Sequence, residues 1–264
     1  MEWKMKKLKA DLLDIGGYKF RSRFILGSGK FSLDMTKTVI ENGGVEMATL
    51  AVRRTNVGGM ENILDYMPEG IVLLPNTSGA RNSDEAVRIA ELARELGCGD
   101  FIKIEIIRDS KYLLPDNAET TKAVAKLKAK DFIVMPYMMP DLSAARDMEE
   151  AGADAIMPLG APIGSNKGLL TRDFIKILVD EIDLPIIVDA GIGRPSQACE
   201  AMELGAAAIM ANTAIATAND PAVMAKAFKI AIEAGRLAYL SGPGRVLEHK
   251  AEASSPLTGF LEER

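Results

Sequence analysis

Histidine is almost absent from this chain of 264 residues, and its scarcity limits the chemistry that the chain can carry out. The single histidine, His249, lies in a polar segment near the carboxyl end. A serine or cysteine hydrolase needs an imidazole as its base, and many catalytic metal sites need imidazole ligands. We therefore expect no such hydrolase and no bound metal, and we assign acid–base work to carboxylates, lysine, tyrosine or water.

Cysteine is nearly as scarce, and the spacing of the two cysteines does not indicate a metal site. Cys98 and Cys199 are far apart in the sequence and belong to no Cys-x-x-Cys motif. This spacing excludes both a disulfide scaffold and a zinc cluster. We expect both thiols to be reduced packing residues in a cytoplasmic protein.

Long hydrophobic runs and an excess of positive charge are also lacking. The longest apolar runs have the length of strands and are interrupted by glycine, proline or charged residues, so none is expected to span a membrane. The segment Met1 to Asp11 is charged throughout and lacks the apolar centre of a signal peptide. A net charge of −5 argues against nucleic acid or an anionic membrane as a partner, because both select basic patches.

What the sequence does contain is an alternation of short apolar runs with helix-like stretches. Strands that alternate with helices form a parallel sheet covered by helices. Eight such units favour a closed (β/α)8 TIM barrel over an open, doubly wound sheet, since no Gly-x-Gly-x-x-Gly follows the first strand. The eight predicted strands are Phe24–Gly29, Val45–Val52, Ile71–Asn76, Asp100–Ile107, Phe132–Tyr137, Ala155–Leu159, Pro185–Ala190 and Ala207–Asn212.

The chain shows no linker or break in composition, so we expect a single TIM-barrel domain over residues 1–264. Residues 1–23 are predicted to form an N-terminal hairpin that closes the bottom of the barrel. Residues 24–235 are predicted to form the barrel core, and residues 236–264 a C-terminal tail.

Capping residues predict several helix ends. Asn82 is expected to cap one helix, and Asp220 with Pro221 is expected to begin another. The second helix is predicted over Ala222–Ala234, with Gly235 ending it.

The fourth predicted strand carries two charged residues that burial alone would not select. Strand periodicity places Ile102, Ile104 and Ile106 on one face, and Lys103 with Glu105 on the other. The isoleucine face suits packing against helices, so Lys103 and Glu105 are expected to point into the barrel. Burial favours neutral lysine, the form that attacks a carbonyl to give a Schiff base. The alternative is an interior ion pair with no catalytic role.

Two loops predict a phosphate site. Strand seven runs into Ala190-Gly-Ile-Gly193 and strand eight into Asn212-Thr-Ala-Ile215. Glycines at a strand-to-helix turn let backbone N–H groups approach an anion, and the loops after strands seven and eight often bind phosphate in this fold. For either loop alone, the alternative is a tight turn with a packing glycine.

Two further features lie at the same end of the predicted barrel. Asp189 shares its parity with Ile187, so its carboxylate is expected to point inward as a third ionisable group near Lys103. The loop after strand six, 157–168, is long and rich in glycine and proline, and such loops are usually functional.

Motifs along nearly the whole chain resemble the bacterial thiazole synthases of thiamin biosynthesis, in the order of that family. The matching stretches are Leu26-Gly-Ser-Gly-Lys30, Ala51-Val-Arg-Arg54, Leu73-Leu-Pro-Asn-Thr77, Ile102-Lys-Ile-Glu105, Leu113-Leu-Pro-Asp116, Met157-Pro-Leu-Gly-Ala-Pro-Ile-Gly-Ser165, Ile187-Val-Asp-Ala-Gly-Ile-Gly193, Ala201-Met-Glu-Leu-Gly205, Asn212-Thr-Ala-Ile215, Ala234-Gly-Arg-Leu-Ala-Tyr239 and Ala253-Ser-Ser-Pro-Leu257.

The resemblance implies a transferase that needs no cofactor. Such an enzyme condenses 1-deoxy-D-xylulose 5-phosphate with dehydroglycine and with sulfur, which a ubiquitin-like carrier protein brings as a C-terminal thiocarboxylate. Lys103 matches the family's imine-forming lysine, and Glu105 and Asp189 match its acid–base carboxylates. The positions that match its sugar-phosphate site are Gly164, Ala190, Gly191, Asn212 and Thr213.

The partners that the resemblance implies are the sulfur carrier and an enzyme that produces dehydroglycine from glycine or tyrosine. Because exposed barrel helices often pack into symmetric oligomers, we also expect the chain to form a homo-oligomer. The alternative function is another Schiff-base sugar-phosphate barrel enzyme, such as an aldolase or a pyridoxal 5′-phosphate synthase-like subunit. A barrel that binds a sugar phosphate without catalysis is a third hypothesis. The sequence departs from the family at Asn166, where glycine is common, and in the segment 241–246.

Overall fold

The computed structural model describes residues 11–51 and 67–246. The predicted strand end at Val52, the motif residues 52–54, the histidine His249 and the tail beyond residue 246 lie outside the described residues.

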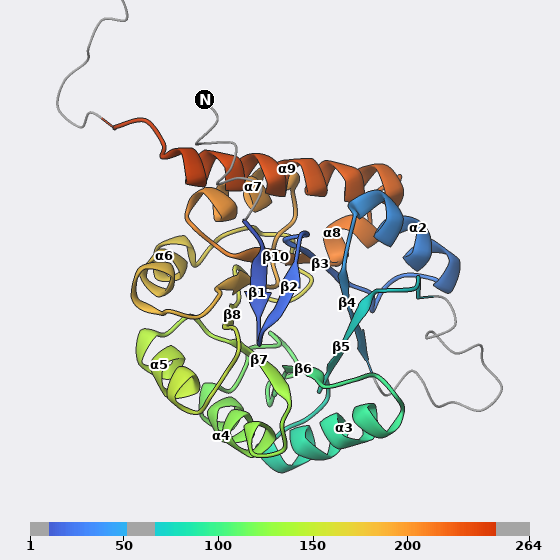
Figure 1. Ribbon diagram of the computed structural model, residues 1–264, viewed down its shortest axis with the longest axis vertical. Coiled ribbons are helices and arrows are strands. Elements are labelled where there is room, and N and C mark those ends of the chain that lie inside the picture. Colours follow the sequence, from blue (N-terminus) through green and yellow to red (C-terminus); the bar gives the residue numbers. More distant parts are fainter. Residues whose placement is uncertain (1–10, 52–66, 247–264) are drawn as a thin grey trace, which may run out of the picture.

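The eight predicted barrel strands are all present, and they form one parallel sheet in the order β8-β7-β6-β5-β4-β3-β10-β9. Parallel bridges between Ile156 and Ile186 and between Leu159 and Asp189 join the two ends of this order, so the sheet closes into a barrel. Figure 1 looks along the barrel axis. The barrel strands are β3 (Phe24–Gly27), β4 (Met47–Ala51), β5 (Val72–Asn76), β6 (Phe101–Ile104), β7 (Ile133–Met138), β8 (Met157–Pro158), β9 (Ile187–Val188) and β10 (Ala208–Ala211).

Helices form the outer layer around this barrel (Figure 1). Most of them follow one strand and precede the next, which is the alternation that the sequence predicts. They are α2 (Leu33–Gly43), α3 (Ser83–Glu95), α4 (Asn117–Lys128), α5 (Leu142–Glu150), α6 (Arg172–Glu181), α7 (Pro195–Glu203), α8 (Thr213–Ala216) and α9 (Pro221–Ser241).

The two faces of β6 divide as strand periodicity predicts. Ile102, Ile104 and Ile106 are fully buried in a cluster that includes side chains from α3, α4 and α5. On the other face, Phe101 belongs to the cluster that fills the lower barrel, and Lys103 lies above it. The prediction that Lys103 points into the barrel is therefore confirmed.

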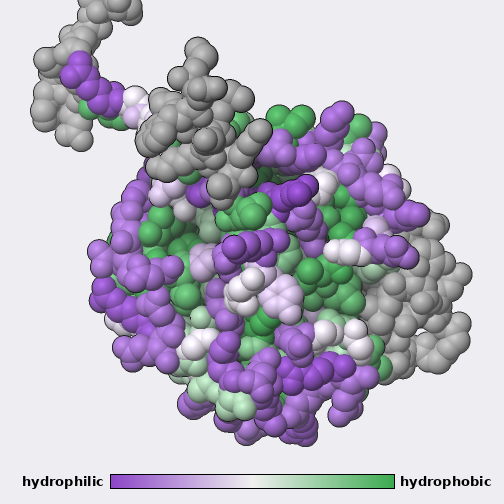
Figure 2. All heavy atoms as spheres, viewed as in Figure 1, coloured by the Kyte–Doolittle hydropathy of each residue, from purple (hydrophilic) through white to green (hydrophobic). Residues whose placement is uncertain are grey.

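An antiparallel hairpin closes the lower end of the barrel, as predicted. Its strands are β1 (Leu13–Ile15) and β2 (Tyr18–Phe20), and they are joined by Gly16 and Gly17, both with positive φ. Leu13, Ile15 and Phe20 pack into the interior cluster. The hairpin crosses the centre of the barrel in Figure 1. In Figure 2, hydrophobic patches lie beside it and hydrophilic residues form the outer rim of this face.

Helix starts follow their caps, but one predicted helix end is wrong. The side chains of Asn82 and Asp220 accept hydrogen bonds from the backbone N–H groups of Glu85 and Val223, as expected for N-caps. Helix α9, in contrast, continues through Gly235 to Ser241.

The reason is packing against α7. A Cβ added at Gly235 would collide with the carbonyl oxygen of Cys199, so glycine lets α9 approach α7 closely. Within residues 11–51 and 67–246, no helix combines the length and the apolar character needed to cross a membrane.

Candidate active site

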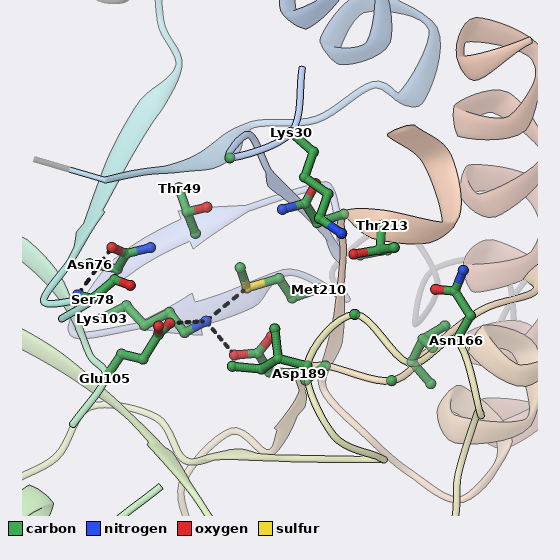
Figure 3. A pocket seen from close by; sticks show the side chains of 18 of the residues that line it. Lys30, Thr49, Asn76, Ser78, Lys103, Glu105, Asn166, Asp189, Met210 and Thr213 are labelled. Carbon is green, nitrogen blue, oxygen red and sulfur yellow. Dashed lines mark hydrogen bonds and ion pairs between the residues drawn. The ribbon is translucent and has the colours of Figure 1, made fainter. Parts of the chain in front are cut away.

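The three ionisable residues predicted to act together meet at the end of β6. The Nζ atom of Lys103 lies 2.5 Å from Oδ2 of Asp189 and 3.5 Å from Oε2 of Glu105. All three side chains are buried, with that of Lys103 only 4% exposed. Figure 3 shows both carboxylates directed at the ammonium group.

These residues lie at the floor of a cavity of about 410 Å³ at the carboxyl ends of the barrel strands. This is the end of the barrel at which active sites form in this fold, because the loops that follow the strands gather there. The cavity lining includes every site residue that the sequence analysis names: Lys103, Glu105, Asp189, Gly164, Ala190, Gly191, Asn212 and Thr213. The sequence prediction of which residues lie together is therefore confirmed, whereas their roles stay predictions.

Burial favours the neutral form of Lys103, as expected, but it does not decide the charge of this residue in the free protein. Burial is the largest single influence and acts to lower the pKa of Lys103, but the charges of Asp189 and Glu105 outweigh it and raise the pKa above its usual value. Lys103 is thus held as an ammonium group. It becomes a nucleophile only when a neighbouring carboxylate accepts its proton.

Soft and aromatic groups complete the surroundings of this ammonium group. The sulfur of Met210 lies 3.8 Å from Nζ of Lys103, and the ring of Tyr137 lies 5.1 Å from it. Burial, with the charges of Asp189 and Glu105, raises the pKa of Tyr137, so its phenol stays neutral. Among the described residues, its hydroxyl has no hydrogen-bond partner. Lys103 therefore has two strong partners, and both are carboxylates.

The backbone around Glu105 is fixed by Thr77, which precedes the segment leading into α3. The hydroxyl of Thr77 accepts a hydrogen bond from the N–H of Glu105 at 2.8 Å and donates one to its carbonyl oxygen at 3.1 Å. This reciprocal pair holds Glu105 just beyond the last residue of β6. Thr77 therefore holds the backbone of Glu105, which lies outside β6, in the position that directs its carboxylate at Lys103.

The loop after β9 has a strained backbone. Ala190 has φ +63° and Gly191 has φ +83°, and a positive φ is costly for alanine. The carbonyl of Ala190 accepts hydrogen bonds from Gly160 and Ala161, which holds this turn in place. A Cβ added at Gly191 would collide with Ala161. Only glycine fits at position 191, and strain of this kind is often found at ligand sites.

Backbone N–H groups at this end of the cavity are available to an anion. In the described part of the chain, the backbone hydrogen bonds outside regular elements include none donated by Gly191, Ile192, Thr213 or Ala214. Gly164 lies beside the second of these loops, since a Cβ built on it would be 3.8 Å from Oγ1 of Thr213. The two loops predicted from the sequence line the same cavity, and they can receive a phosphate group.

Asn166 occupies a position where glycine is common in the family that the sequence resembles, and asparagine fits the local backbone. Its φ is +52°, and asparagine tolerates this left-handed conformation better than most residues with a side chain. A Cβ added at Gly193 would collide with its carbonyl oxygen, so the two loops touch at this point. The loop that carries Gly164 therefore accommodates asparagine at this position.

Several further polar residues line the cavity, and none of them was predicted from the sequence. Lys30 follows β3, Thr49 belongs to β4, and Asn76 and Ser78 lie at and after the end of β5. All four follow the rule that selected the named residues, since they are polar and lie near the carboxyl ends of strands. Among the described residues, no group of three or more histidine, cysteine, aspartate and glutamate side chains is placed to hold a metal ion.

Comparisons with known proteins agree along almost the whole chain. The family model of thiazole biosynthesis protein ThiG matches residues 14–256. A thiazole synthase of Clostridium beijerinckii is 70% identical over 256 residues, which cover 97% of this chain and all of that protein. A thiazole synthase of Fusobacterium nucleatum is 66% identical over 251 residues, which cover 95% of this chain and 98% of that protein.

A solved structure is similar in fold and in sequence. It is a chain in the crystal structure of the BexX/CysO complex of Amycolatopsis orientalis, with a TM-score of 0.80 and 31% identity. The match covers 90% of the present chain and 98% of that one.

Proposed function

This chain belongs to the ThiG family of thiazole biosynthesis proteins and acts as a thiazole synthase, and we propose that its reaction proceeds through an imine on Lys103. The substrates proposed are 1-deoxy-D-xylulose 5-phosphate, dehydroglycine and a sulfur-carrier thiocarboxylate. The observation that carries the role of Lys103 is its contact with two carboxylates at the floor of a cavity of about 410 Å³.

Imine formation begins with a proton transfer. Lys103 is charged in the free protein, and Asp189, at 2.5 Å, is the nearer carboxylate and accepts its proton. The neutral amine then adds to the ketone carbon of the sugar phosphate, which gives a carbinolamine. Protonation of the carbinolamine hydroxyl releases water and leaves the imine.

Glu105 is proposed to act in the later proton transfers. Its carboxylate lies 3.5 Å from Nζ of Lys103, so it is within reach of the carbon atoms next to the new imine. Removing a proton from such a carbon gives an enamine, in which the sugar can rearrange before nitrogen and sulfur are added. Two carboxylates on one amine allow one to be protonated while the other stays ionised.

The loops after β9 and β10 are proposed to hold the phosphate of the substrate. The strained turn at Ala190 and Gly191 and the N–H groups of Ile192, Thr213 and Ala214 support this proposal. They fix the substrate at one end of the cavity, and Lys103 lies at its floor. This arrangement holds the ketone carbon near Nζ, and such positioning is a large part of catalysis.

A protein is proposed to deliver the sulfur. A similar solved chain comes from a complex of two proteins, BexX and CysO, which supports a protein partner for the present chain. The proposed partner is a ubiquitin-like carrier whose C-terminal thiocarboxylate enters the cavity, and a separate enzyme supplies dehydroglycine. We place these steps in the cytoplasm. The two cysteines of this chain are both free, and they would stay reduced there.

The chain is also proposed to form a homo-oligomer. Three apolar side chains at and before α6 are exposed, namely Leu170, Phe174 and Ile177. Exposed apolar residues grouped on one element are typical of protein contacts. Native mass spectrometry of the purified protein gives the number of copies, and a monomer at micromolar concentration contradicts this part of the proposal.

The proposed reaction is tested by reconstitution. Purified protein is incubated with 1-deoxy-D-xylulose 5-phosphate, dehydroglycine and the carrier thiocarboxylate, and the thiazole phosphate is measured by mass spectrometry. We expect product with the wild type and none above background with Lys103→Ala. The same variant should fail to support growth of a strain that requires thiazole. Full growth with Lys103→Ala would mean that Lys103 has no covalent role.

A further inference from the structure

We propose that Lys30 recognises the phosphate of the substrate and makes the cavity selective for phosphorylated ketones. This inference rests on the proposed function, because it assumes that the cavity accepts a sugar phosphate. The loops after β9 and β10 offer backbone N–H groups but no positive charge, and Lys30 adds that charge. In this proposal, the ammonium group of Lys30 pairs with the phosphate while the loops donate N–H groups to it.

The position of Lys30 brings its ammonium group to those loops. A Cβ built on Gly164 would lie 3.7 Å from Nζ of Lys30 and 3.8 Å from Oγ1 of Thr213. Lys30 therefore reaches the same point as a loop after β8 and the loop after β10. Figure 3 shows its side chain extending over the cavity towards Thr213, at a distance from the Lys103 cluster.

Close backbone packing explains how the loop after β3 reaches this point. Strands β3 and β10 are neighbours in the barrel, with Leu26 paired with Ala211. A Cβ added at Gly27 would collide with the side chain of Asn212, so glycine lets the end of β3 lie directly against the phosphate loop. Lys30 follows only three residues later and cannot lie far from that loop.

The charges of the cavity indicate why a second lysine is needed. The charged side chains that line it are Lys30, Lys103, Glu105 and Asp189. Lys103 already contacts both carboxylates, so this cluster has a net charge of −1 when all three are ionised. A phosphate dianion entering beside such a cluster would be repelled. Lys30 supplies the opposite charge at the point where the phosphate is proposed to bind.

Lys30 is free to bind an anion. Its side chain is exposed, and within the described part of the chain it forms no ion pair or hydrogen bond. An exposed lysine at the rim also orients the substrate, since the phosphate then lies near solvent and the ketone points to the floor. Lysine suits a phosphate at a rim because its flexible stem can follow the ligand.

The first test compares two substrates that differ only in the phosphate. Initial rates of imine formation are measured for 1-deoxy-D-xylulose 5-phosphate and for unphosphorylated 1-deoxy-D-xylulose, with wild type, Lys30→Met and Lys30→Arg. A lost charge-assisted contact of this kind weakens binding by about ten- to a hundredfold. We expect Lys30→Met to raise the half-saturating concentration of the phosphorylated ketone by that factor, with a smaller change in the limiting rate of imine formation. The half-saturating concentration of the unphosphorylated ketone should stay the same.

Matched variants separate this effect from a general loss of charge or of structure. Lys37→Met removes an exposed lysine of α2 that does not line the cavity, and it should behave as the wild type. Lys30→Arg keeps the charge and should recover most of the binding. If Lys30→Met discriminates between the two ketones as the wild type does, the inference is wrong.

The second test needs no turnover and so separates this inference from the proposed function. Binding of inorganic phosphate is measured by calorimetry to the full chain as wild type, Lys30→Met and Lys103→Ala. We expect phosphate binding to weaken about tenfold or more in Lys30→Met and to persist in Lys103→Ala. Phosphate binding that depends on Lys30, combined with no imine on Lys103, would refute the proposed reaction and support this site. Unchanged phosphate binding in Lys30→Met would overturn the site itself.

Discussion

The two ends of the barrel each contain a cluster of buried or partly buried opposite charges, and the clusters differ in their cations and in what surrounds them. At the mouth, Lys103 contacts two carboxylates. At the bottom, two arginines, Arg23 and Arg236, share one carboxylate, that of Asp11. Only the first cluster lies at the floor of the cavity formed by the loops that follow the strands.

The bottom cluster joins three parts of the chain. Arg23 donates to Oδ1 of Asp11 at 2.9 Å and to the carbonyl oxygen of Ala207 at 2.7 Å. Arg236 on α9 makes a bidentate contact with the same carboxylate, at 2.9 Å and 2.7 Å. Arginine keeps its charge at all ordinary pH values and provides several donors in a fixed plane. This cluster therefore connects the residue before the hairpin, the start of β3 and the last helix.

The mouth cluster has the reverse properties. Its cation is a lysine, which becomes a nucleophile when it loses a proton. Its anions outnumber the cation, so a carboxylate is available to accept that proton. Because both clusters contain buried charge, a buried charge by itself is no evidence of catalysis. The bottom cluster also borders a cavity, of about 450 Å³, so a cavity alone does not separate the two. The type of cation and the ratio of carboxylates to cations distinguish a reactive cluster from a structural one.

Exchanging the cation at the mouth should have the largest effect. Lys103→Arg keeps a positive charge between Glu105 and Asp189 but removes the nucleophile. We expect thiazole formation to fall by more than about a thousandfold, with the protein still folded. Activity and circular dichroism are measured on the same preparation. Activity within tenfold of the wild type would show that the charge of Lys103, not its nitrogen, is what the reaction uses.

Removing the nearer carboxylate should have the next largest effect. Asp189→Asn is expected to lower kcat by about a hundredfold or more, because general acid–base catalysis contributes effects of this size. Glu105→Gln should also lower kcat. Asp189 is the stronger of the two charges that raise the pKa of Lys103, so Asp189→Asn should also lower that pKa. Equal pH–rate profiles for wild type and Asp189→Asn would contradict the assigned proton transfer.

The corresponding exchange at the bottom should affect stability rather than activity. Arg23→Lys keeps the charge but loses the planar set of donors that contacts Asp11 and Ala207. We expect the free energy of unfolding to fall by about 1–3 kcal/mol, as measured by urea denaturation. The kcat of the folded variant should match the wild type. A large loss of kcat without a loss of stability would remove the distinction between the two clusters.

The smallest effect should appear at acid pH. A hydrogen bond from Arg236, with the nearby charge of Arg23, lowers the pKa of Asp11 below its usual value near 3.8. A lowered pKa in the folded state stabilises the fold above the unfolded pKa, and this contribution is lost as the pH falls through the folded pKa. We expect Asp11→Asn to reduce the dependence of unfolding free energy on pH between about 4 and 2. Identical slopes for both proteins would contradict this.

Local rules explain which parts of this molecule the sequence predicts. The strand period of two is sufficient to place Lys103 and Asp189 inside the barrel and Ile104 outside, because each depends only on neighbouring residues. The start of α9 at Pro221 is predicted for the same reason. The parallel barrel itself follows from eight repeats of strand and helix.

Contacts between distant segments explain what sequence reasoning missed. A glycine such as Gly235 is typical of a helix end. Only the contact with α7 shows that this glycine is needed for close helix packing. The pKa of Lys103 depends on the distances from its Nζ to the carboxylates of Glu105 and Asp189, and a sequence motif does not give these distances. Lys30 lies in a motif at the end of the first barrel strand. Its relation to the loop after β10 arises only when the barrel closes and brings the first strand beside the last.

Trapping of the imine tests the central claim most directly. The protein is incubated with 1-deoxy-D-xylulose 5-phosphate, reduced with borohydride and digested, and the peptides are analysed by mass spectrometry. Our account predicts one reduced sugar-phosphate adduct, on Lys103, and none on Lys30 or on Lys229 beside the bottom cluster. It also predicts no adduct in Lys103→Arg. An adduct on another lysine would contradict the account, as would trapping with ribose 5-phosphate but not with the deoxyxylulose phosphate.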